Sequence, residues 1–167
     1  MSTNKKRYIA LIQGVVNDTL FDVLKKRKST EIYILEGRPK LKAAKVLSKS
    51  SLKRKIVPTL IADNMAGFLF YKNLVKEVWL SYQLLDKNGA VCDIGGLILA
   101  VLGHKHKVPV YLYPTAEKTP LMGKKSDVLN FNGVRVAPRN VNAYVPLVEW
   151  VPRKYISKTY SVHGSKN

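Results

Sequence analysis

The segment TLIADNMAG, residues 59–67, decides the fold class of this chain. An apolar run ends abruptly at Asp63 and Asn64, and a helix-compatible stretch follows at once. In parallel α/β sheets, ligands bind beyond the carboxyl ends of the strands, close to helix N-termini. Asp and Asn also cap helices for structural reasons alone. Taken by itself, the segment leaves both interpretations open.

Apolar runs and amphipathic stretches alternate on either side of this segment. Strands are expected over residues 8–12, 30–35, 56–61, 75–80 and 108–113, and a helix is expected after each of the first four. Such alternation predicts an α/β fold, a parallel sheet flanked by helices with right-handed crossovers. Asn88-Gly89 indicates a turn. Residues 115–132 are polar and are expected to form a loop before a short strand over 134–136.

Length and composition favour one cytoplasmic domain. The 167 residues are 46% hydrophobic, enough for a real core, and are expected to form a single domain with frayed ends at 1–6 and 165–167. No apolar run is long enough to cross a bilayer, and the N-terminus does not resemble a signal peptide. The single cysteine, Cys92, allows no internal disulfide and fits a reducing compartment.

The net charge suggests phosphate-rich partners. Lys and Arg number 29 against 11 Asp and Glu, which gives a formal charge of +18. Such an excess raises affinity for RNA, DNA and sugar phosphates. The lysines are spread along the chain rather than gathered in one tail, so a solvated basic surface explains them equally well. RNA or ribosome contact is therefore one possibility among several.

The residues that most often carry chemistry form no convincing constellation. His104 and His106 are two apart, and a zinc site would need Cys92 and His163 as further ligands. We expect neither a metal site nor a cofactor, since the glycine-rich loops of dinucleotide sites and P-loops are absent. Cys92 is expected to be a buried, inert thiol rather than a nucleophile.

The order of several motifs resembles one family. The motifs are Glu36-Gly37-Arg38-Pro39, the stretch from Pro58 to Gly67, Asn88-Gly89 with Ile94-Gly95, the stretch from His106 to Tyr111, the stretch from Gly133 to Pro138, and Tyr144-Val145-Pro146. Together they resemble the family of methylthioribose-1-phosphate isomerases, ribose-1,5-bisphosphate isomerases and regulatory subunits of eukaryotic initiation factor two-B. The resemblance runs from about residue 9 to about residue 164.

This resemblance implies a Rossmann-like domain that commonly forms homodimers. Members of the family join a small N-terminal helical domain to a Rossmann-like one, and this chain resembles the second part alone. In the isomerases, the first part supplies some of the arginine and glycine residues that bind phosphate. We therefore expect a homodimer whose site lacks that contribution.

The family's catalytic positions look replaced in this chain. The Cys-Asn-Ala-Gly motif of the isomerases is matched by residues 12–15, which contain no thiol, and their Gly-Ala-Asp is matched by residues 81–83, which end in Gln83. An amide cannot exchange a proton as a carboxylate does. Lys42 stands in place of a family Gln, and Asp93 in place of an Asn-Lys pair. No catalytic residue is therefore assigned.

These matches predict a non-catalytic relative that binds a sugar phosphate or a nucleotide, or serves as a scaffold. The expected ligand-binding residues are Arg38, Lys42, Asp63, Asn64, Gln83 and Asp93, of which Arg38, Asp63 and Asn64 follow the family pattern. Lys45 is expected to add phosphate attraction near the same crevice. The alternatives are an active aldose–ketose isomerase with rewired residues or a partner chain, and a basic RNA- or ribosome-associated module.

Overall fold

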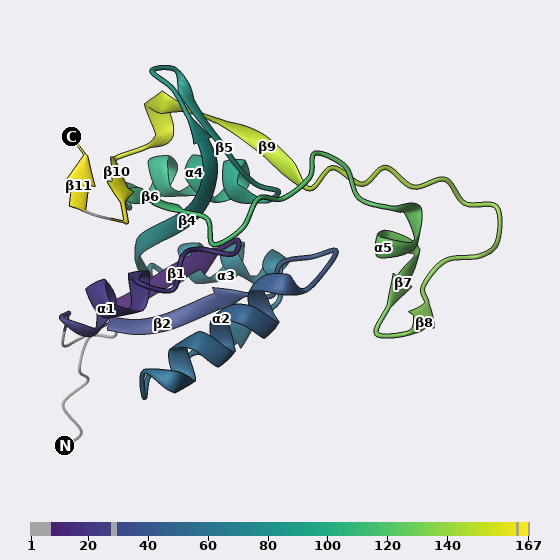
Figure 1. The fold of residues 1–167 in the computed structure, drawn as a ribbon, viewed down its shortest axis with the longest axis horizontal. Helices are drawn as coiled ribbons and strands as arrows, with labels where there is room; N and C mark the ends of the chain where they lie inside the picture. The colour runs from purple at the N-terminus through teal and green to yellow at the C-terminus, as the bar shows by residue number, and fades with distance from the viewer. Residues whose placement is uncertain (1–7, 28–29, 163, 167) are drawn as a thin grey trace.

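A nine-stranded mixed sheet organises the computed structural model of this chain, which describes residues 8–27, 30–162 and 164–166 (Figure 1). Its strands are β1 (Tyr8–Gln13), β2 (Thr30–Leu35), β3 (Thr59–Ile61), β4 (Val75–Leu85), β5 (Gly89–Asp93), β6 (Val110–Pro114), β9 (Val148–Pro152), β10 (Lys158–Ser161) and β11 (Gly164–Lys166). The α-helices are α1 (Leu20–Lys25), α2 (Lys42–Lys53), α3 (Ala66–Tyr71), α4 (Gly96–His106) and α5 (Lys125–Leu129), and 3₁₀ turns lie at η1 (Asp63–Met65) and η2 (Arg153–Tyr155). A separate hairpin pairs β7 (Asn130–Phe131) with β8 (Val134–Arg135).

The parallel part of the sheet has the order β3-β2-β1-β4-β6-β10. The chain moves outward from β1 to β2 and β3, then returns to the other side of β1 to form β4. Ile12 of β1 accordingly lies between Ile34 of β2 and Trp79 of β4. The order of strands reverses between β1 and β4, which is where open α/β sheets bind their ligands. The predicted Rossmann-like fold is confirmed.

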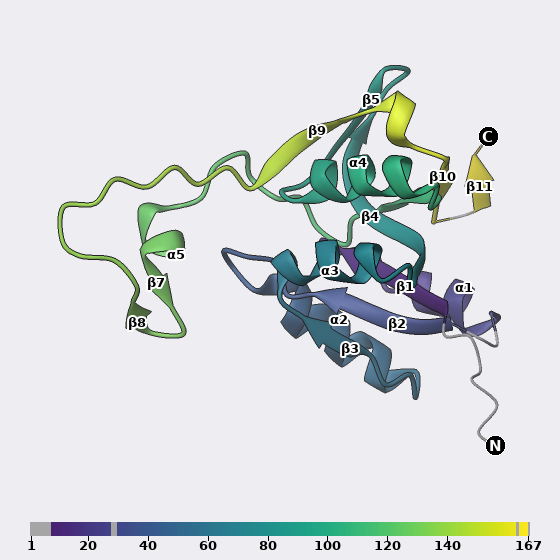
Figure 2. The ribbon, with the colours of Figure 1, turned by 180° about the vertical axis from the view of Figure 1, so that it is seen from behind.

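Helices cover both faces of this sheet, as Figures 1 and 2 show from opposite sides. The face that carries Ala10 and Ile12 packs against α1 and α2 through Phe21 and Leu47. The opposite face, with Ile9 and Leu11, packs against α3 and α4. Because β1 is buried on both faces, it reads in the sequence as a continuous apolar run.

An antiparallel extension was not expected from the sequence. β4 continues to Leu85, turns at Asp86 and returns as β5, and β9 then pairs with β5. The carboxylate of Asp86 accepts hydrogen bonds from the backbone N–H groups of Asn88 and Gly89, at 2.6 and 3.1 Å, so the expected turn is present. β5, β9 and β10 are short and lack a long apolar run, which is why the alternation of strands and helices did not reveal them.

Prolines shift several expected boundaries. The strand expected at 56–61 is only β3, because Pro58 has no N–H to donate to a neighbouring strand. The strand expected at 108–113 begins after Pro109, as β6. The loop expected at 115–132 contains α5, and the strand expected at 134–136 is β8. Residues 1–6 and 167 of the ends expected to fray lie outside the described residues, whereas Gly164–Lys166 form β11.

Two further features bear on function. Among the described residues, the longest helix has twelve residues, and none is long and apolar enough to span a bilayer. Residues 124–144, here called the arm, carry α5, β7 and β8 and project from the body of the sheet (Figure 1). No residue of the arm is buried.

Candidate functional site

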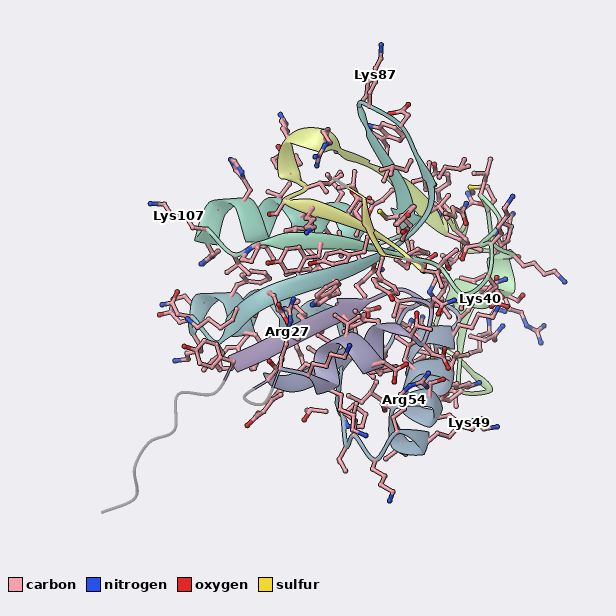
Figure 3. The ribbon with its side chains drawn as sticks, turned by 60° about the vertical axis from the view of Figure 1, so that its left-hand side comes forward. Arg27, Lys40, Lys49, Arg54, Lys87 and Lys107 are labelled. Carbon is pink, nitrogen blue, oxygen red and sulfur yellow. The ribbon has the colours of Figure 1, made fainter. Side chains whose placement is uncertain are left out.

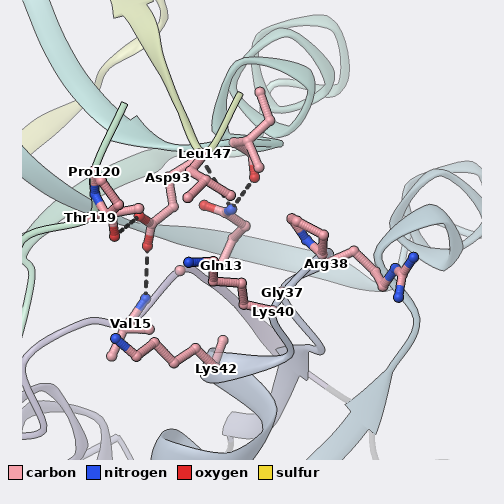
Figure 4. Close-up of a pocket in the computed structure, with 14 residues that line it drawn as sticks. Gln13, Val15, Gly37, Arg38, Lys40, Lys42, Asp93, Thr119, Pro120 and Leu147 are labelled. Atoms are coloured by element: carbon pink, nitrogen blue, oxygen red, sulfur yellow. Dashed lines mark hydrogen bonds between the residues drawn. The ribbon is translucent and has the colours of Figure 1, made fainter. Parts of the chain in front are cut away.

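A cavity lies at the carboxyl ends of β1 and β5, beside the point where the strand order reverses (Figure 4). It encloses about 530 Å³, counting the part that opens to solvent. The lining residues are Gln13, Gly14, Val15, Gly37, Arg38, Pro39, Lys40, Lys42, Ala43, Asp93, Ile94, Thr119, Pro120 and Leu147.

Asp93 joins three segments that form the deeper side of the cavity, here called the inner wall: the loop after β1, β4 at Ser81, and the loop after β6. Its Oδ2 accepts hydrogen bonds from the Val15 backbone N–H at 3.0 Å and from the Ser81 hydroxyl at 2.7 Å. Its Oδ1 accepts one from the Thr119 hydroxyl at 2.8 Å. A carboxylate that already accepts three hydrogen bonds from the protein is committed to holding the loop after β1, the middle of β4 and the loop after β6 in place.

Gly14 lets these segments approach so closely. Its φ is +80°, and an added Cβ would lie 2.0 Å from Ser81 Oγ and 2.4 Å from Asp93 Oδ2. Real side chains do not tolerate such distances, and the positive φ itself favours glycine. The inner wall therefore requires glycine at the residue that follows β1.

Gln13 closes the bottom of the cavity. Its side chain is 3% exposed, and its amide N–H donates to the Ile94 carbonyl at 2.6 Å and weakly to the Asp93 carbonyl at 3.4 Å. Gln13 Oε1 is buried and has no hydrogen-bond partner among the described residues. Gln13 is thus held by the β5–α4 connection and has no acidic proton to transfer.

The β2–α2 loop forms the other side of the cavity, and Asp63 supports it from behind. The two carboxylate oxygens of Asp63 accept hydrogen bonds from the backbone N–H groups of Gly37, at 2.9 Å, and Arg38, at 2.7 Å. This arrangement gives Asp63, which lies two residues after β3, a structural role. Asp63 shapes the cavity without lining it, and Asn64 is exposed on η1.

Three basic side chains surround the opening of the cavity, and we call them the rim. The Arg38 guanidinium extends away from Gln13 and lies over the Phe131 ring, 4.5 Å from its centroid (Figure 4). Lys40 Nζ lies 3.7 Å from Asp127 Oδ2, and Lys42 forms an ion pair with Glu117. The rim is therefore cationic, and each of its members already contacts the segment between β6 and β9.

A side chain of the protein accepts the free backbone N–H groups at the N-terminus of α4. Glu149 Oε1, from β9, accepts hydrogen bonds from the backbone N–H groups of Gly95 at 2.6 Å and Leu97 at 3.0 Å. Helix N-termini at this edge of a sheet often hold an anion of the ligand. Here a side-chain carboxylate occupies that position.

The structure brings together three of the six expected ligand-binding residues. Arg38, Lys42 and Asp93 line the cavity, whereas Asp63, Asn64 and Gln83 do not. Gln83 is one step removed, since its Oε1 accepts a hydrogen bond from the Thr119 N–H at 2.8 Å. Lys45 does not line the cavity either.

Sequence reasoning missed Gln13, Lys40 and Thr119. Gln13 could have been found, because it ends the strand beside the reversal of strand order. No sequence signal locates Thr119, which lies in a polar stretch without periodicity.

Cys92 lies away from the cavity. It is 1% exposed, sits within β5 and does not line the cavity. Burial raises the pKa of its thiol, and the nearby negative charges of Asp93 and Glu149 raise it further. Nucleophilic cysteines carry a lowered pKa, so this thiol has the character of a structural one.

The two described histidines lie at the end of α4. The His104 ring packs against Tyr155 and the His106 ring against Phe70. His163, the other histidine considered for zinc, lies outside the described residues. In the described part of the chain, no group of three or more His, Cys, Asp or Glu residues is placed to hold a metal ion.

Basic side chains also lie far from the cavity. Figure 3 shows Arg27, Lys87 and Lys107 on separate parts of the molecule, and Lys49 and Arg54 at α2. The densest stripe is on α2, where Lys42, Lys45, Lys49 and Lys53 recur at helical spacing and no acidic residue interrupts them. The positive charge is thus distributed over the surface.

Comparisons with known proteins agree on one family. Residues 9–164 match the model of the initiation factor 2 subunit family. Methylthioribose-1-phosphate isomerase from Desulfitobacterium hafniense is 32% identical over 149 residues, which cover 82% of this chain and 43% of that protein. The protein of the same name from Thermus thermophilus is 29% identical over 150 residues, which cover 80% of this chain and 44% of that protein. The chain therefore spans less than half the length of these curated relatives.

Solved structures support the same fold. Crystalline 5-methylthioribose 1-phosphate isomerase from Pyrococcus horikoshii OT3 superposes with a TM-score of 0.80 at 23% identity, over 92% of this chain and 49% of that one. The delta subunit of translation initiation factor eIF-2B from A. fulgidus gives a TM-score of 0.80 at 17% identity, over 90% of this chain and 51% of that one. At these identities the similarity concerns the fold alone.

Proposed function

The chain belongs to the initiation factor 2 subunit family, and we propose that it binds a sugar phosphate or a nucleotide in the cavity beside Gln13 without isomerising it. The observation that carries this proposal is the contrast between the rim and the inner wall. Arg38, Lys40 and Lys42 offer positive charge at the opening, as recognition of a phosphate requires.

The interior supports binding rather than isomerisation. An aldose–ketose exchange moves a proton or hydride between adjacent carbons, and a positioned acid or base contributes about 10²–10⁴-fold to such a step. Among the described residues that line the cavity, Asp93 is the one carboxylic acid, and the protein's own N–H and O–H groups occupy it. The thiol of Cys92 is buried elsewhere.

Isothermal titration calorimetry with a panel of sugar phosphates and nucleotides tests the proposal. We expect saturable binding that weakens about tenfold in Lys42→Ala, as for the loss of one charge-assisted contact. Lys49→Ala removes the same charge from the same helix outside the cavity and serves as the matched control. Absence of heat with every compound would overturn the ligand proposal and leave a scaffold role.

A second candidate function, contact with RNA or the ribosome, is favoured by the lysine stripe of α2. Binding through such a surface releases counterions, so its affinity must fall steeply as salt rises. Co-sedimentation with ribosomes between 50 and 300 mM salt, about the range over which counterion release is large, measures this dependence. Binding that persists unchanged at the upper salt concentration would contradict it.

We also propose that two copies associate through α3 and the exposed part of α4, which lie side by side on one face (Figure 2). Phe68, Tyr71 and Ile98 are 57%, 73% and 66% exposed there. Residues 66–71 and 96–104 contain no Lys, Arg, Asp or Glu, so this face offers apolar contact area between two copies. The Lys72 ammonium lies at its edge, 5.6 and 5.3 Å from the ring centroids of Phe68 and Tyr71, and must be accommodated at the contact. Light scattering should give a dimer that Ile98→Lys dissociates and Val134→Lys, on the arm, does not.

A further inference from the structure

The rim residues Arg38 and Lys40 have two roles, because they also hold the arm. The Arg38 guanidinium lies over Phe131, in β7, and the Lys40 ammonium faces the carboxylate of Asp127, in α5. Within the described part of the chain, these are the ring and ion-pair contacts that join residues 124–144 to the body. The cations expected to bind a ligand are therefore the cations that fasten the arm.

The arm has little else to keep it in place. None of residues 124–144 is buried, so the arm contributes no side chain to either core cluster. Its hydrogen bonds are local: Lys124 N–H donates to Asp127 Oδ2 at 2.8 Å, and Val136 N–H donates to the Leu129 carbonyl at 2.9 Å. The arm is thus a small unit with its own internal bonds, docked on the body by a few contacts between partly exposed residues.

The chain on both sides of the arm is anchored far more firmly than the arm itself. Thr119 N–H donates to Gln83 at 2.8 Å, Leu147 N–H donates to the Leu121 carbonyl at 3.0 Å, and Gly123 N–H donates to the Val145 carbonyl at 2.8 Å. A change at the rim would therefore move the arm about a boundary near Gly123 and Val145 and leave the inner wall intact.

The contacts at the rim are weak enough for a ligand to displace. The Lys40 and Asp127 side chains are 42% and 21% exposed, and the Lys40 nitrogen lies 3.7 Å from Asp127 Oδ2, too far for a strong hydrogen bond. An exposed ion pair or cation–π contact shifts an equilibrium by only about twofold to fivefold. A phosphate, which carries more negative charge than one carboxylate, competes well for the same cations.

We propose that the arm is an internal competitor of the ligand: Asp127 and Phe131 occupy the rim cations in the free protein, and an anion that binds at Arg38 and Lys40 releases the arm. This inference rests on the proposed function, since it concerns regulation of the same cavity. Linkage makes the effect reciprocal: the factor by which the docked arm weakens anion binding is the factor by which a bound anion weakens arm docking.

Spin labels on the full chain measure the position of the arm. Ser126→Cys, in α5, and Lys49→Cys, in α2, are exposed sites, whereas the native thiol of Cys92 is too buried to label. Double electron–electron resonance should give a narrow distribution of distances between the two labels without ligand. With saturating ribose 5-phosphate or inorganic phosphate, the mean distance should be longer and the distribution broader. Sodium chloride at matched ionic strength is the control, because salt alone screens exposed pairs.

Calorimetry on charge variants tests the competition itself. Asp127→Asn should bind ribose 5-phosphate about twofold to fivefold more tightly. Asp86→Asn makes the same change of charge on the β4–β5 turn and should leave the affinity within about 1.5-fold, since its charge is remote and screened. A bound ligand with an unmoved arm, or equal affinities for the two variants, would overturn this inference alone. No heat in wild type or either variant with any compound of the sugar-phosphate and nucleotide panel would overturn the proposed function and the ligand trigger together.

Discussion

The inner wall and the rim of one cavity are built in opposite ways. Asp93, Gly14 and Gln13 are held by short hydrogen bonds and close approach, and they join strands that are distant in sequence. Lys40 and Lys42 are half exposed and form ion pairs with single acidic side chains. The inner wall is therefore held rigidly and contributes to folding. The rim cations are held by weak contacts, so they can exchange those partners for an anionic ligand and contribute to recognition. Four measurements test this contrast.

The largest effect is expected from Gly14→Ala. The new Cβ would clash with Ser81 and Asp93, and the φ of +80° adds backbone strain. We expect the free energy of unfolding to fall by about 3–4 kcal/mol, near the upper end of single substitutions. Denaturation by urea, followed by circular dichroism, measures it.

Gly133→Ala is the matched control. Gly133 has nearly the same φ, +79°, but an added Cβ would meet nothing within 4 Å. Its loss of stability should be only about 1–2 kcal/mol, the strain of the left-handed backbone alone. Equal losses at the two glycines would show that the inner wall is not tightly packed, and the contrast with the rim would fail.

Asp93→Ala should give the next largest effect. The Val15 N–H and the hydroxyls of Ser81 and Thr119 would lose their acceptor in a partly buried site. Buried donors left unpaired cost about 1–3 kcal/mol each at most, and relaxation of the two hydroxyls brings the expected total to about 2–3 kcal/mol. Asp86→Ala, which removes two hydrogen bonds from an exposed turn, should cost less than about 1 kcal/mol by the same measurement. A comparable loss at Asp86 would contradict the role given to Asp93.

These residues also show how far the sequence alone leads. The alternation of strands and helices, and a crevice at the carboxyl ends of the strands, follow from apolar runs and the turn residues that separate them. Arg38, Lys42 and Asp93 were expected from the family resemblance, because they stand at positions matched to its motifs. Thr119 and Glu149 could not be predicted, since each reaches its partner across more than twenty residues through loops and short strands that have no periodicity.

Asp63 shows a different kind of limit. The sequence predicted that Asp63 lies just after the third strand. A carboxylate at that position can contact a ligand, or it can accept hydrogen bonds from the backbone of Gly37 and Arg38, as it does here. Only the direction of the side chain decides between them, and that direction depends on how the β2–α2 loop folds over it. Patterns of residues locate such a side chain without fixing its partner.

Alkaline pH tests whether the region behind the inner wall is as closed as the structure indicates. Burial raises the folded-state pKa of Cys92 above its unfolded value of about 8.5. Its contribution to stability is therefore fully present below about pH 8.5 and is lost as the pH rises, because the unfolded chain releases the proton first. The free energy of unfolding should fall by up to about 1.4 kcal/mol per pH unit from this group, or about 2 kcal/mol by pH 10.

Cys92→Ala isolates that contribution. The variant lacks the thiol but keeps every lysine and tyrosine, so the difference between its pH profile and that of wild type reports Cys92 alone. An unperturbed thiol titrates at about pH 8 to 10. If the free energy of unfolding of wild type and of Cys92→Ala changed in parallel over that range, the thiol would be accessible in the folded protein.

The smallest effect is expected at the rim, from the pair of Lys42 and Glu117. Both side chains are about half exposed, at 54% and 48%, so water and salt screen their attraction. A double-mutant cycle of Lys42→Ala and Glu117→Ala should give a coupling of about 0.5 kcal/mol or less, which disappears near 0.5 M salt.

A second ion pair makes that result interpretable. Arg54, at 22% exposure, contacts both Asp18 and Asp22 at 3.0 Å and joins α1 to the end of α2. Its coupling with Asp18 should exceed that of Lys42 with Glu117 and persist in salt, because a less exposed guanidinium with two partners is harder to screen. If the rim pair proved the stronger of the two, Lys42 would belong to the rigidly held part of the cavity, and an anion could not draw it away from Glu117 without weakening the fold.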